Sequence, residues 1–162
     1  MPESAPRVLS IVWNLIRGGT EGQCARVAMG LAERGHVHRV AVFRREGFFL
    51  DRVEAACGPV LDLGIRRMFS LETQRAIVRL ADWIREEQID VVHLWDIDAV
   101  IFGSMAARKA GLPYITSRRD MAQIYPAHKI AMMRYADRRA AGIVANAEAI
   151  KAMLEEEGRR VV

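Results

Sequence analysis

Two adjacent glycines are the first candidates for chemistry in this sequence. Gly18 and Gly19 follow an apolar stretch with a strand pattern, and a helical pattern begins directly after them. Glycines at such a corner let the backbone approach a ligand closely, and the first helical N–H groups point outward at the positive end of the helix dipole. We expect Thr20 to be the N-cap, with Gln23 as its capping-box partner. The pattern is typical of an anion site, usually for phosphate, although a tight strand-to-helix turn also uses glycine.

Other polar residues follow the apolar segments where those segments end. They are Asn14 and Arg17 after the first, Arg44 and Arg45 after the second, His93, Trp95, Asp96 and Asp98 around the end of the fourth, and Ser117, Arg118, Arg119 and Asp120 at the end of the fifth. The carboxyl ends of parallel strands meet at one edge of a sheet, where ligands bind at the switch point of the strand order. The concentration of these residues therefore predicts a binding cleft at that edge.

Strand-like and helix-like segments alternate along the chain and must position these residues. The strands are predicted at residues 8–13, 38–43, 60–63, 91–94, 114–117 and 142–145, and the helices at residues 21–34, 48–57, 71–87, 99–110, 127–139 and 147–157. Strands that are apolar at consecutive positions, each followed by an amphipathic helix, indicate a parallel sheet covered on both faces. We expect an α/β fold with a Rossmann-like, doubly wound parallel sheet in three layers.

The composition fits one domain, with residues 1–6 as a flexible tail. The chain has 162 residues, of which 51% are hydrophobic and 27% charged, with a net charge of +4. The basic residues form no block of five or six, so a nucleic-acid partner is not indicated, whereas anionic ligands or acidic lipid surfaces are favoured. Cys24 and Cys57 lack metal-ligand spacing, so no metal is expected. No apolar run is long enough for a signal peptide or a membrane span, and we expect a cytoplasmic protein with free thiols.

Several phrases of the sequence resemble those of one enzyme family. The turn Gly18-Gly19-Thr20-Glu21 is followed by a helix that ends in L-A-E-R-G-H at residues 31–36. Further phrases are I-D-V-V-H at residues 89–93, A-A-R-K-A-G-L-P at 106–113, A-D at 136–137 and I-V-A-N-A-E-A-I-K at 143–151. In this order they resemble the GT-B glycosyltransferases, in particular the large retaining family 4, over nearly the whole chain. The resemblance implies one half of a GT-B architecture.

In that architecture two Rossmann-like domains face each other across a cleft. The N-terminal domain mostly holds the acceptor, and the C-terminal domain mostly holds the nucleotide-sugar donor. The family's donor-side motif with two glutamates does not occur in residues 1–162, so we expect the donor domain to be absent and the chain alone to be inactive. The resemblance thus implies an enzyme of glycan biosynthesis, expected at the bacterial cell envelope. It would transfer a sugar from a nucleotide-sugar to a glycan or lipid-linked acceptor, without a further cofactor.

The resemblance also assigns roles to residues at the predicted edge. Gly18, Gly19 and Thr20 would lie against the donor diphosphate, where N–H groups stabilise charge on the leaving nucleotide. Arg118 and Arg119 would bind acceptor or phosphate oxygens, because guanidinium groups suit both. Solvated loop charges are the alternative for the two arginines.

The other candidates come from the ends of the first and fourth strands. His93 matches a family histidine and is a candidate for catalysis, although such a histidine is more often a core residue hydrogen-bonded within the sheet. The family often has a second histidine where this chain has Trp95, which can stack on an acceptor sugar but cannot take a proton. Asp96 or Asp98 could serve instead, and one of them is expected to cap the next helix. Asn14 is a further candidate for acceptor contact.

Two alternatives from other classes stay open. The first is an NADP-binding fragment of an oxidoreductase. Gly19 and Gly22 match two glycines of a dinucleotide fingerprint, but Arg17 replaces its first glycine, and Arg44 and Arg45 replace the acidic residue of an NAD site. The second is a non-catalytic Rossmann-like module that binds a phosphorylated small molecule.

Two predicted loops mix arginines with large apolar residues. They are residues 44–49, with Phe48 and Phe49, and residues 66–69, with Met68 and Phe69. In related enzymes such loops meet lipid-linked acceptors at the membrane. We therefore expect peripheral association with the inner membrane face, with packing of these side chains on the core as the alternative.

Overall fold

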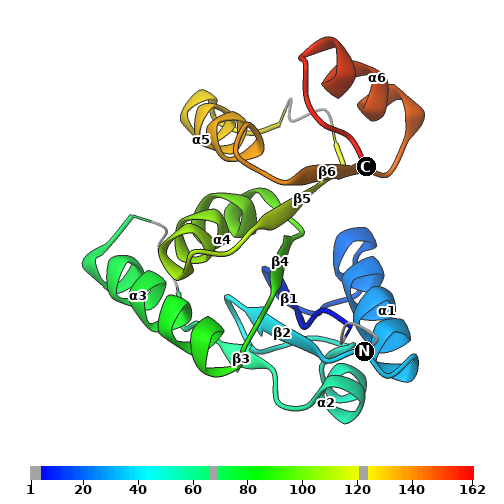
Figure 1. Cartoon of the computed structure of the whole chain (residues 1–162), viewed down its shortest axis with the longest axis vertical. Helices are drawn as coiled ribbons and strands as arrows, with labels where there is room; N and C mark the ends of the chain where they lie inside the picture. The colour runs from blue at the N-terminus through cyan, green and yellow to red at the C-terminus, as the bar shows by residue number, and fades with distance from the viewer. Residues whose placement is uncertain (1–4, 66–68, 121–123) are drawn as a thin grey trace.

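The computed structural model of the chain describes residues 5–65, 69–120 and 124–162. These residues form one sheet of six parallel strands in the order β3-β2-β1-β4-β5-β6 (Figure 1). The strands are β1 (Val8–Val12), β2 (His38–Val42), β3 (Leu61–Asp62), β4 (Val91–Leu94), β5 (Tyr114–Arg118) and β6 (Gly142–Ala145). The helices are α1 (Gly19–Glu33), α2 (Leu50–Cys57), α3 (Leu71–Glu86), α4 (Ile97–Ala110), α5 (Ala127–Asp137) and α6 (Glu148–Glu156). The predicted doubly wound, Rossmann-like fold is confirmed.

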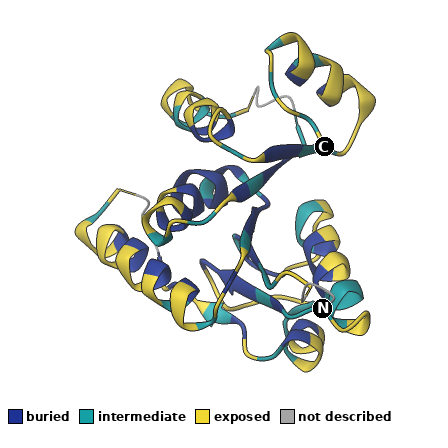
Figure 2. Cartoon of the chain, viewed as in Figure 1, coloured by how far each residue is buried: buried dark blue, intermediate teal, exposed yellow. Residues whose placement is uncertain are grey.

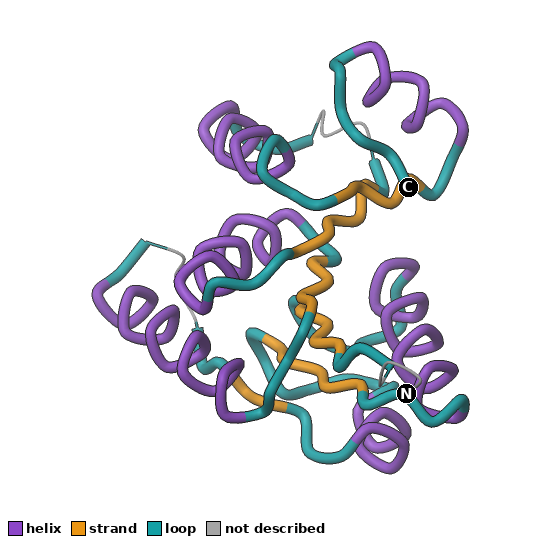
Figure 3. Tube along the Cα trace, viewed as in Figure 1, coloured by secondary structure: helices purple, strands orange, loops and turns teal. Residues whose placement is uncertain are grey.

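Helices cover both faces of the sheet, whose strands run side by side through the middle of the molecule (Figures 1 and 3). α1 and α2 pack on one face through a core that includes Cys24, Val40 and Val53. α3, α4 and α5 pack on the other face, where Ile11 and Phe102 belong to the larger core. Buried residues fill the strands and the inner sides of the helices (Figure 2). Burial on both faces explains why the strands are apolar at consecutive positions.

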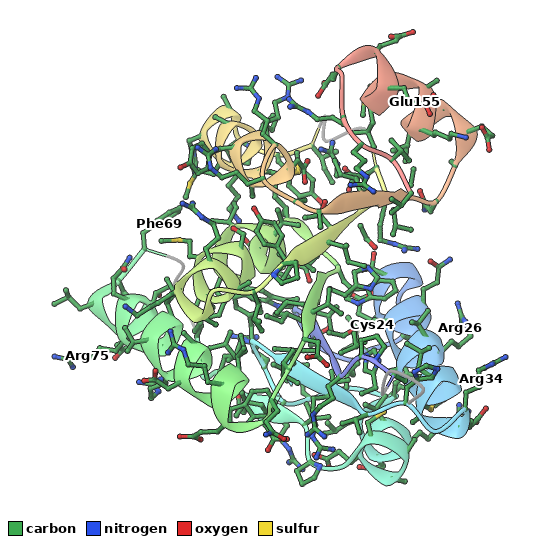
Figure 4. The ribbon with its side chains drawn as sticks, in the orientation of Figure 1. Cys24, Arg26, Arg34, Phe69, Arg75 and Glu155 are labelled. Atoms are coloured by element: carbon green, nitrogen blue, oxygen red, sulfur yellow. The ribbon has the colours of Figure 1, made fainter. Side chains whose placement is uncertain are left out.

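The start of α1 differs from the prediction. The helix begins at Gly19 and its N-cap is Gly18, so Thr20 lies within the first turn. The predicted N-cap at Thr20 and its capping box with Gln23 are therefore wrong. Cys24 lies between α1 and the sheet, buried with a free thiol, as its place on the apolar stripe of the helix suggests (Figure 4). Within the described residues, no helix combines the length and the apolar character that crossing a bilayer requires.

Candidate functional site

The candidate site lies at the carboxyl edge of the sheet, next to the point between β1 and β4 where the strand order reverses. A hollow of about 40 Å³ opens there. Its walls come from α1, from the segments after β4 and β5, and from α5; they are Thr20, Trp95, Asp96, Ile97, Val100, Ser117, Arg119, Asp120, Tyr125 and Met133. Six of these wall residues were predicted at this edge from the sequence: Thr20, Trp95, Asp96, Ser117, Arg119 and Asp120. The hollow is too small for a sugar, so a nucleotide or sugar would lie over this edge rather than inside it.

Gly18 and Gly19 form an exposed corner at the start of α1. Gly18 has φ −148° and ψ 166°, an extended conformation that any residue adopts. A methyl group on Gly18 would collide with the Glu21 carboxylate, which folds back over the helix start. A methyl group on Gly19 would meet no atom within 4 Å. The amide corner at Gly19 is therefore open on its outer side.

The loop after β1 is fixed to the loop after β2. The Leu15 N–H donates to the Glu46 carbonyl at 3.0 Å, and the Phe49 N–H donates to the Leu15 carbonyl at 2.9 Å. Gly47 lies between these bonds with φ +127°, where any side chain would collide with the Leu15 backbone. The Arg17 guanidinium packs over the Phe48 ring at 3.9 Å. These contacts hold the corner in place and direct Arg17 toward Phe48.

Asn14 is a part of this loop rather than an open contact for an acceptor. Its side chain is buried, and Oδ1 lies 3.5 Å from the Ile16 N–H, which donates to it. Such a local bond is typical of a polar residue that shapes a turn. The structure gives Asn14 this role, and the predicted acceptor contact does not fit its burial.

Arg119 joins the segment after β5 to α1. Its guanidinium donates to Gln23 Oε1 and lies 5.8 Å from the centre of the Trp95 ring. Burial lowers the pKa of Arg119, and the nearby Glu21 carboxylate acts in the opposite direction. A cation beside the start of α1 adds to the positive end of the helix dipole. Arg119, Thr20 and the corner at Gly19 therefore form one positively polarised surface.

Arg118 has a different environment from its neighbour. Its side chain is 6% exposed and pairs with Asp137 on α5 at 2.9 Å, and Asp137 also accepts from Thr116 at 2.8 Å. This ion pair holds β5 against α5. An open acceptor contact by Arg118 does not fit this burial, so the predicted pair of arginines reduces to Arg119 at the site.

Trp95 lies in the core, 3% exposed, and its Nε1–H donates to Ser10 Oγ at 2.9 Å. The His93 ring packs against it with centroids 4.1 Å apart. A ring buried to this extent offers no face to a sugar. Its burial gives no support to the predicted stacking of Trp95 on an acceptor, which stays a prediction.

Of the two roles considered for His93, a catalytic residue or a core histidine bonded within the sheet, the structure shows the environment of a core histidine. Its Nε2 lies 2.8 Å from Ser117 Oγ in the interior of the sheet. Burial lowers the pKa of His93 to about 3, so the ring is neutral near pH 7. A general acid or base works best with a pKa near the operating pH. The geometry therefore favours a structural role for His93 over the predicted catalytic one.

Asp96 caps α4, as expected for one of the two aspartates. Its carboxylate accepts from the Ala99 N–H at 2.9 Å and from the Trp13 N–H at 2.7 Å, which ties the end of β1 to the start of α4. Burial raises the pKa of Asp96 to about 6. Asp98 instead pairs with Lys129 of α5 at 2.6 Å. The two bonds to backbone N–H groups make Asp96 an anchor of the edge, and its predicted catalytic role stays a hypothesis.

Some residues at this edge were not assigned a role from the sequence. Tyr125 donates to the Asp120 carboxylate at 2.9 Å and lines the hollow, but no motif or periodicity marks it. Glu21 lies over Gly18 at the corner, and Gln23, which the sequence suggested only as a capping-box partner, accepts from Arg119. An acidic residue in the first helical turn was a usable signal for Glu21. No group of His, Cys, Asp and Glu with metal-binding geometry occurs within residues 5–65, 69–120 and 124–162.

The sheet order and the position of the hollow define a Rossmann-like domain with a ligand edge at its switch point. The chain belongs to glycosyltransferase family 4, because the sequence model of the family described as Glycosyltransferase Family 4 matches residues 17–162. No curated protein matches the sequence. Family and fold together make this a domain of the GT-B type.

Solved structures show the same fold at low sequence identity. HepE from Anabaena, in a complex with UDP and glucose, matches with a TM-score of 0.76 and 19% identity over 96% of this chain and 42% of its own. MurG from Acinetobacter baumannii matches with a TM-score of 0.63 and 15% identity over 86% and 41%. A Listeria monocytogenes protein described as a candidate UDP-N-acetylglucosamine 2-epimerase matches with a TM-score of 0.68 and 15% identity. The match covers 96% of this chain and 42% of that protein. This chain therefore spans less than half of each of these proteins.

Removing the buried cation should test the structural role of Arg118. We expect Arg118→Met to lower the free energy of unfolding by about 3–5 kcal/mol, because Asp137 is then buried without its partner. Urea unfolding measures the loss. Adding Asp137→Asn should restore part of the stability, and a single variant as stable as the wild type would contradict the buried ion pair.

The burial of His93 predicts a dependence of stability on pH. Its folded pKa lies below the unfolded value near 6.5, so the unfolded state binds more protons and stability falls as the pH drops from 6.5 toward 4. We expect His93→Gln to lose about 2–3 kcal/mol less than the wild type over this range. Asp96, whose folded pKa is raised, increases stability as the pH falls. It does so equally in the wild type and in His93→Gln, so its contribution cancels when the two pH profiles are compared. Equal pH profiles in urea unfolding would show that the ring is not buried as described.

Proposed function

We propose that this chain is the acceptor-side domain of a retaining, nucleotide-sugar-dependent glycosyltransferase, working opposite a donor-binding domain. Membership of glycosyltransferase family 4 supports transferase chemistry. The chain covers about 42% of the length of HepE, which leaves room for a second domain of similar size in a protein of that kind. On this proposal the chain alone does not transfer sugar.

Gly19 is the observation that carries the proposal. Glycine in a helix interior is less stable than alanine by up to about 1 kcal/mol, and at Gly19, the first residue of α1, a methyl group would meet no other part of the chain within 4 Å. The backbone there is helical and has no positive φ, so neither a steric clash nor a left-handed conformation requires glycine at this position. A group from outside the chain that approaches the amide corner would give that reason. A donor phosphate at the positive end of α1 is such a group.

The proposed chemistry follows from the charge of this surface. Departure of the nucleotide leaves negative charge on its diphosphate, and N–H groups fixed at the start of α1 stabilise that charge without reorganisation. Arg119 lies beside Thr20 at the same edge and would bind a phosphate or acceptor oxygen. Neither step uses a metal held by the described side chains. Because HepE is seen with UDP and glucose, UDP-sugars are the first donors to test.

The alternatives receive less support from the structure. For NADP, the arginines after β2 would bind the ribose phosphate, but Arg45 is held by Glu54 in a two-pronged ion pair at 2.7 and 2.8 Å. A non-catalytic phosphate-binding module would use the same corner as the proposed transferase. The two differ in nucleotide release: a transferase joined to its donor domain frees UDP from a UDP-sugar, and a binding module does not.

Peripheral association with a membrane also stays a proposal. Phe48 and Phe69 are 51% and 63% exposed, whereas Phe49 packs on the core, so the two predicted loops contain both kinds of side chain. Phe69 lies just before α3 (Figure 4), and its ring meets that of His128 on α5 edge to face, with centroids 6.2 Å apart. Arg66, Arg67 and Met68 lie outside the described residues.

The open corner gives a prediction for Gly19. In a polypeptide that joins this chain to a donor-binding domain, Gly19→Ala should lower kcat/KM for the UDP-sugar by about tenfold or more, because the methyl group separates the phosphate from the amides. Thermal unfolding should show unchanged or slightly higher stability. Gly30→Ala, in the same helix but away from the corner, is the matched control. Unchanged kinetics for Gly19→Ala would contradict the proposed phosphate contact.

Arg119 should contribute to substrate binding at the same edge. We expect Arg119→Ala to lower kcat/KM by about tenfold to a hundredfold, since a charge-assisted hydrogen bond is worth roughly 1.5–3 kcal/mol. Arg75→Ala removes an exposed arginine that points away from the molecule and should leave the kinetics unchanged (Figure 4). An equal effect of both variants would show that only the net charge matters.

A further inference from the structure

We propose that the groove between α4 and α5 binds an acyl chain of an acidic phospholipid, whose head group contacts Arg108 and Arg139. The inference rests on the proposed association with a membrane, and it names a surface outside the two loops considered for that role. It does not depend on sugar transfer.

An apolar groove of about 520 Å³ lies between α4 and α5, two helices that pack side by side on one face of the sheet (Figure 1). Its lining includes Ile101 and Met105 of α4, Met132 and Tyr135 of α5, and the buried Tyr114 of β5. Met105 is 41% exposed and Tyr135 is 50% exposed, so the groove opens to the surface. Sites for small apolar ligands have volumes of about 300–1,000 Å³, and this groove is large enough for one.

The polar atoms of the lining limit what the groove can hold. The Ser104 hydroxyl donates to the Ile101 carbonyl at 3.1 Å, and the Tyr114 hydroxyl donates to the Ala136 carbonyl at 2.7 Å. Both hydroxyl hydrogens are therefore used within the chain. Among the lining residues that the structure describes, Arg108 alone is charged. An extended peptide would bring backbone N–H and C=O groups without partners here, whereas an acyl chain brings none.

Two arginines flank the Tyr135 ring at the groove. The Arg139 guanidinium packs over this ring at 3.7 Å, and the Arg108 guanidinium lies 5.9 Å from its centre. The acidic residues of α4 and α5 are Asp98 and Asp137, and each is paired with a different cation. These carboxylates are therefore engaged elsewhere, and an anion from outside the chain can neutralise the two arginines.

This combination matches the chemistry of an acidic phospholipid in a bilayer. The lipid supplies an apolar chain for the groove and a phosphate for the arginines, and surfaces with acidic lipids attract basic side chains. Tyrosine and arginine also suit the boundary between acyl chains and water, because each has an apolar body and a polar end. Phe69, which is 63% exposed and contacts His128 of α5, adds an apolar side chain near this helix. A second copy of the chain would bring the same cations together, and their repulsion disfavours it as the occupant.

Vesicle binding by the intact chain tests the two arginines. We expect the chain to sediment with vesicles of phosphatidylglycerol and phosphatidylcholine in equal parts, and much less with phosphatidylcholine alone. Arg108→Gln combined with Arg139→Gln should weaken binding to the acidic vesicles by about tenfold or more. The control combines Arg75→Gln with Arg79→Gln, which removes the same charge from the exposed side of α3 and should have a much smaller effect.

Met105→Glu tests the groove itself. A carboxylate at this position repels the acidic lipid and obstructs the acyl chain, so we expect binding about tenfold weaker than in the wild type. Val78→Glu is the matched control, because Val78 is 42% exposed on α3 and the substitution adds the same charge. In bilayer discs whose lipids carry a spin label on the acyl chain, the NMR signals of the Met105 and Met132 methyl groups should broaden more than those of Met29 and Met153, which belong to α1 and α6.

Equal losses in the two arginine pairs, or in Met105→Glu and Val78→Glu, overturn the proposal, because net charge alone then explains the binding. Absence of vesicle binding by the wild type also overturns it, including where the chain instead binds an acidic peptide or forms a dimer. Binding that Phe48→Ser abolishes and the groove variants leave unchanged assigns the membrane contact to the loop after β2 and overturns the proposal as well. Failure of the proposed transferase function has a different result: Gly19→Ala then leaves donor turnover unchanged, while vesicle binding still depends on the groove.

Discussion

The buried Asp96 carboxylate holds together the part of the fold on which the site depends. It accepts from the Trp13 N–H, directly after β1, and from the Ala99 N–H in the first turn of α4. These segments are far apart in the sequence and meet where the strand order reverses. Burial raises the pKa of this carboxyl to about 6, while the bonds from backbone N–H groups, those of Ala99 and Trp13 foremost, act in the opposite direction and favour the charged form. The loop that carries Gly18 and Gly19 starts from this anchor.

A second set of contacts connects the interior of the sheet, near β1 and β4, to the charged surface at its edge. Ser10, in the middle of β1, accepts from Trp95 and lies 3.0 Å from the His38 Nε2. Trp95 packs on His93, and the Arg119 guanidinium lies on the outer side of Trp95, where it reaches α1. The rings of Trp95 and His93 thus lie beneath Arg119. The position of this charged side chain is therefore set by the packed core.

The sequence predicted the sheet and the place of the Gly-Gly turn, though not the cap of its helix, because each depends on local pattern. Apolar strands followed by amphipathic helices and a Gly-Gly turn before a helix need no knowledge of distant contacts. The two arginines show where this fails. Arg118 ends β5 and Arg119 follows it, so their side chains point to opposite faces, one into Asp137 and one toward α1. Trp95 follows its strand as a loop residue would, and its burial depends on Ser10, 85 positions away.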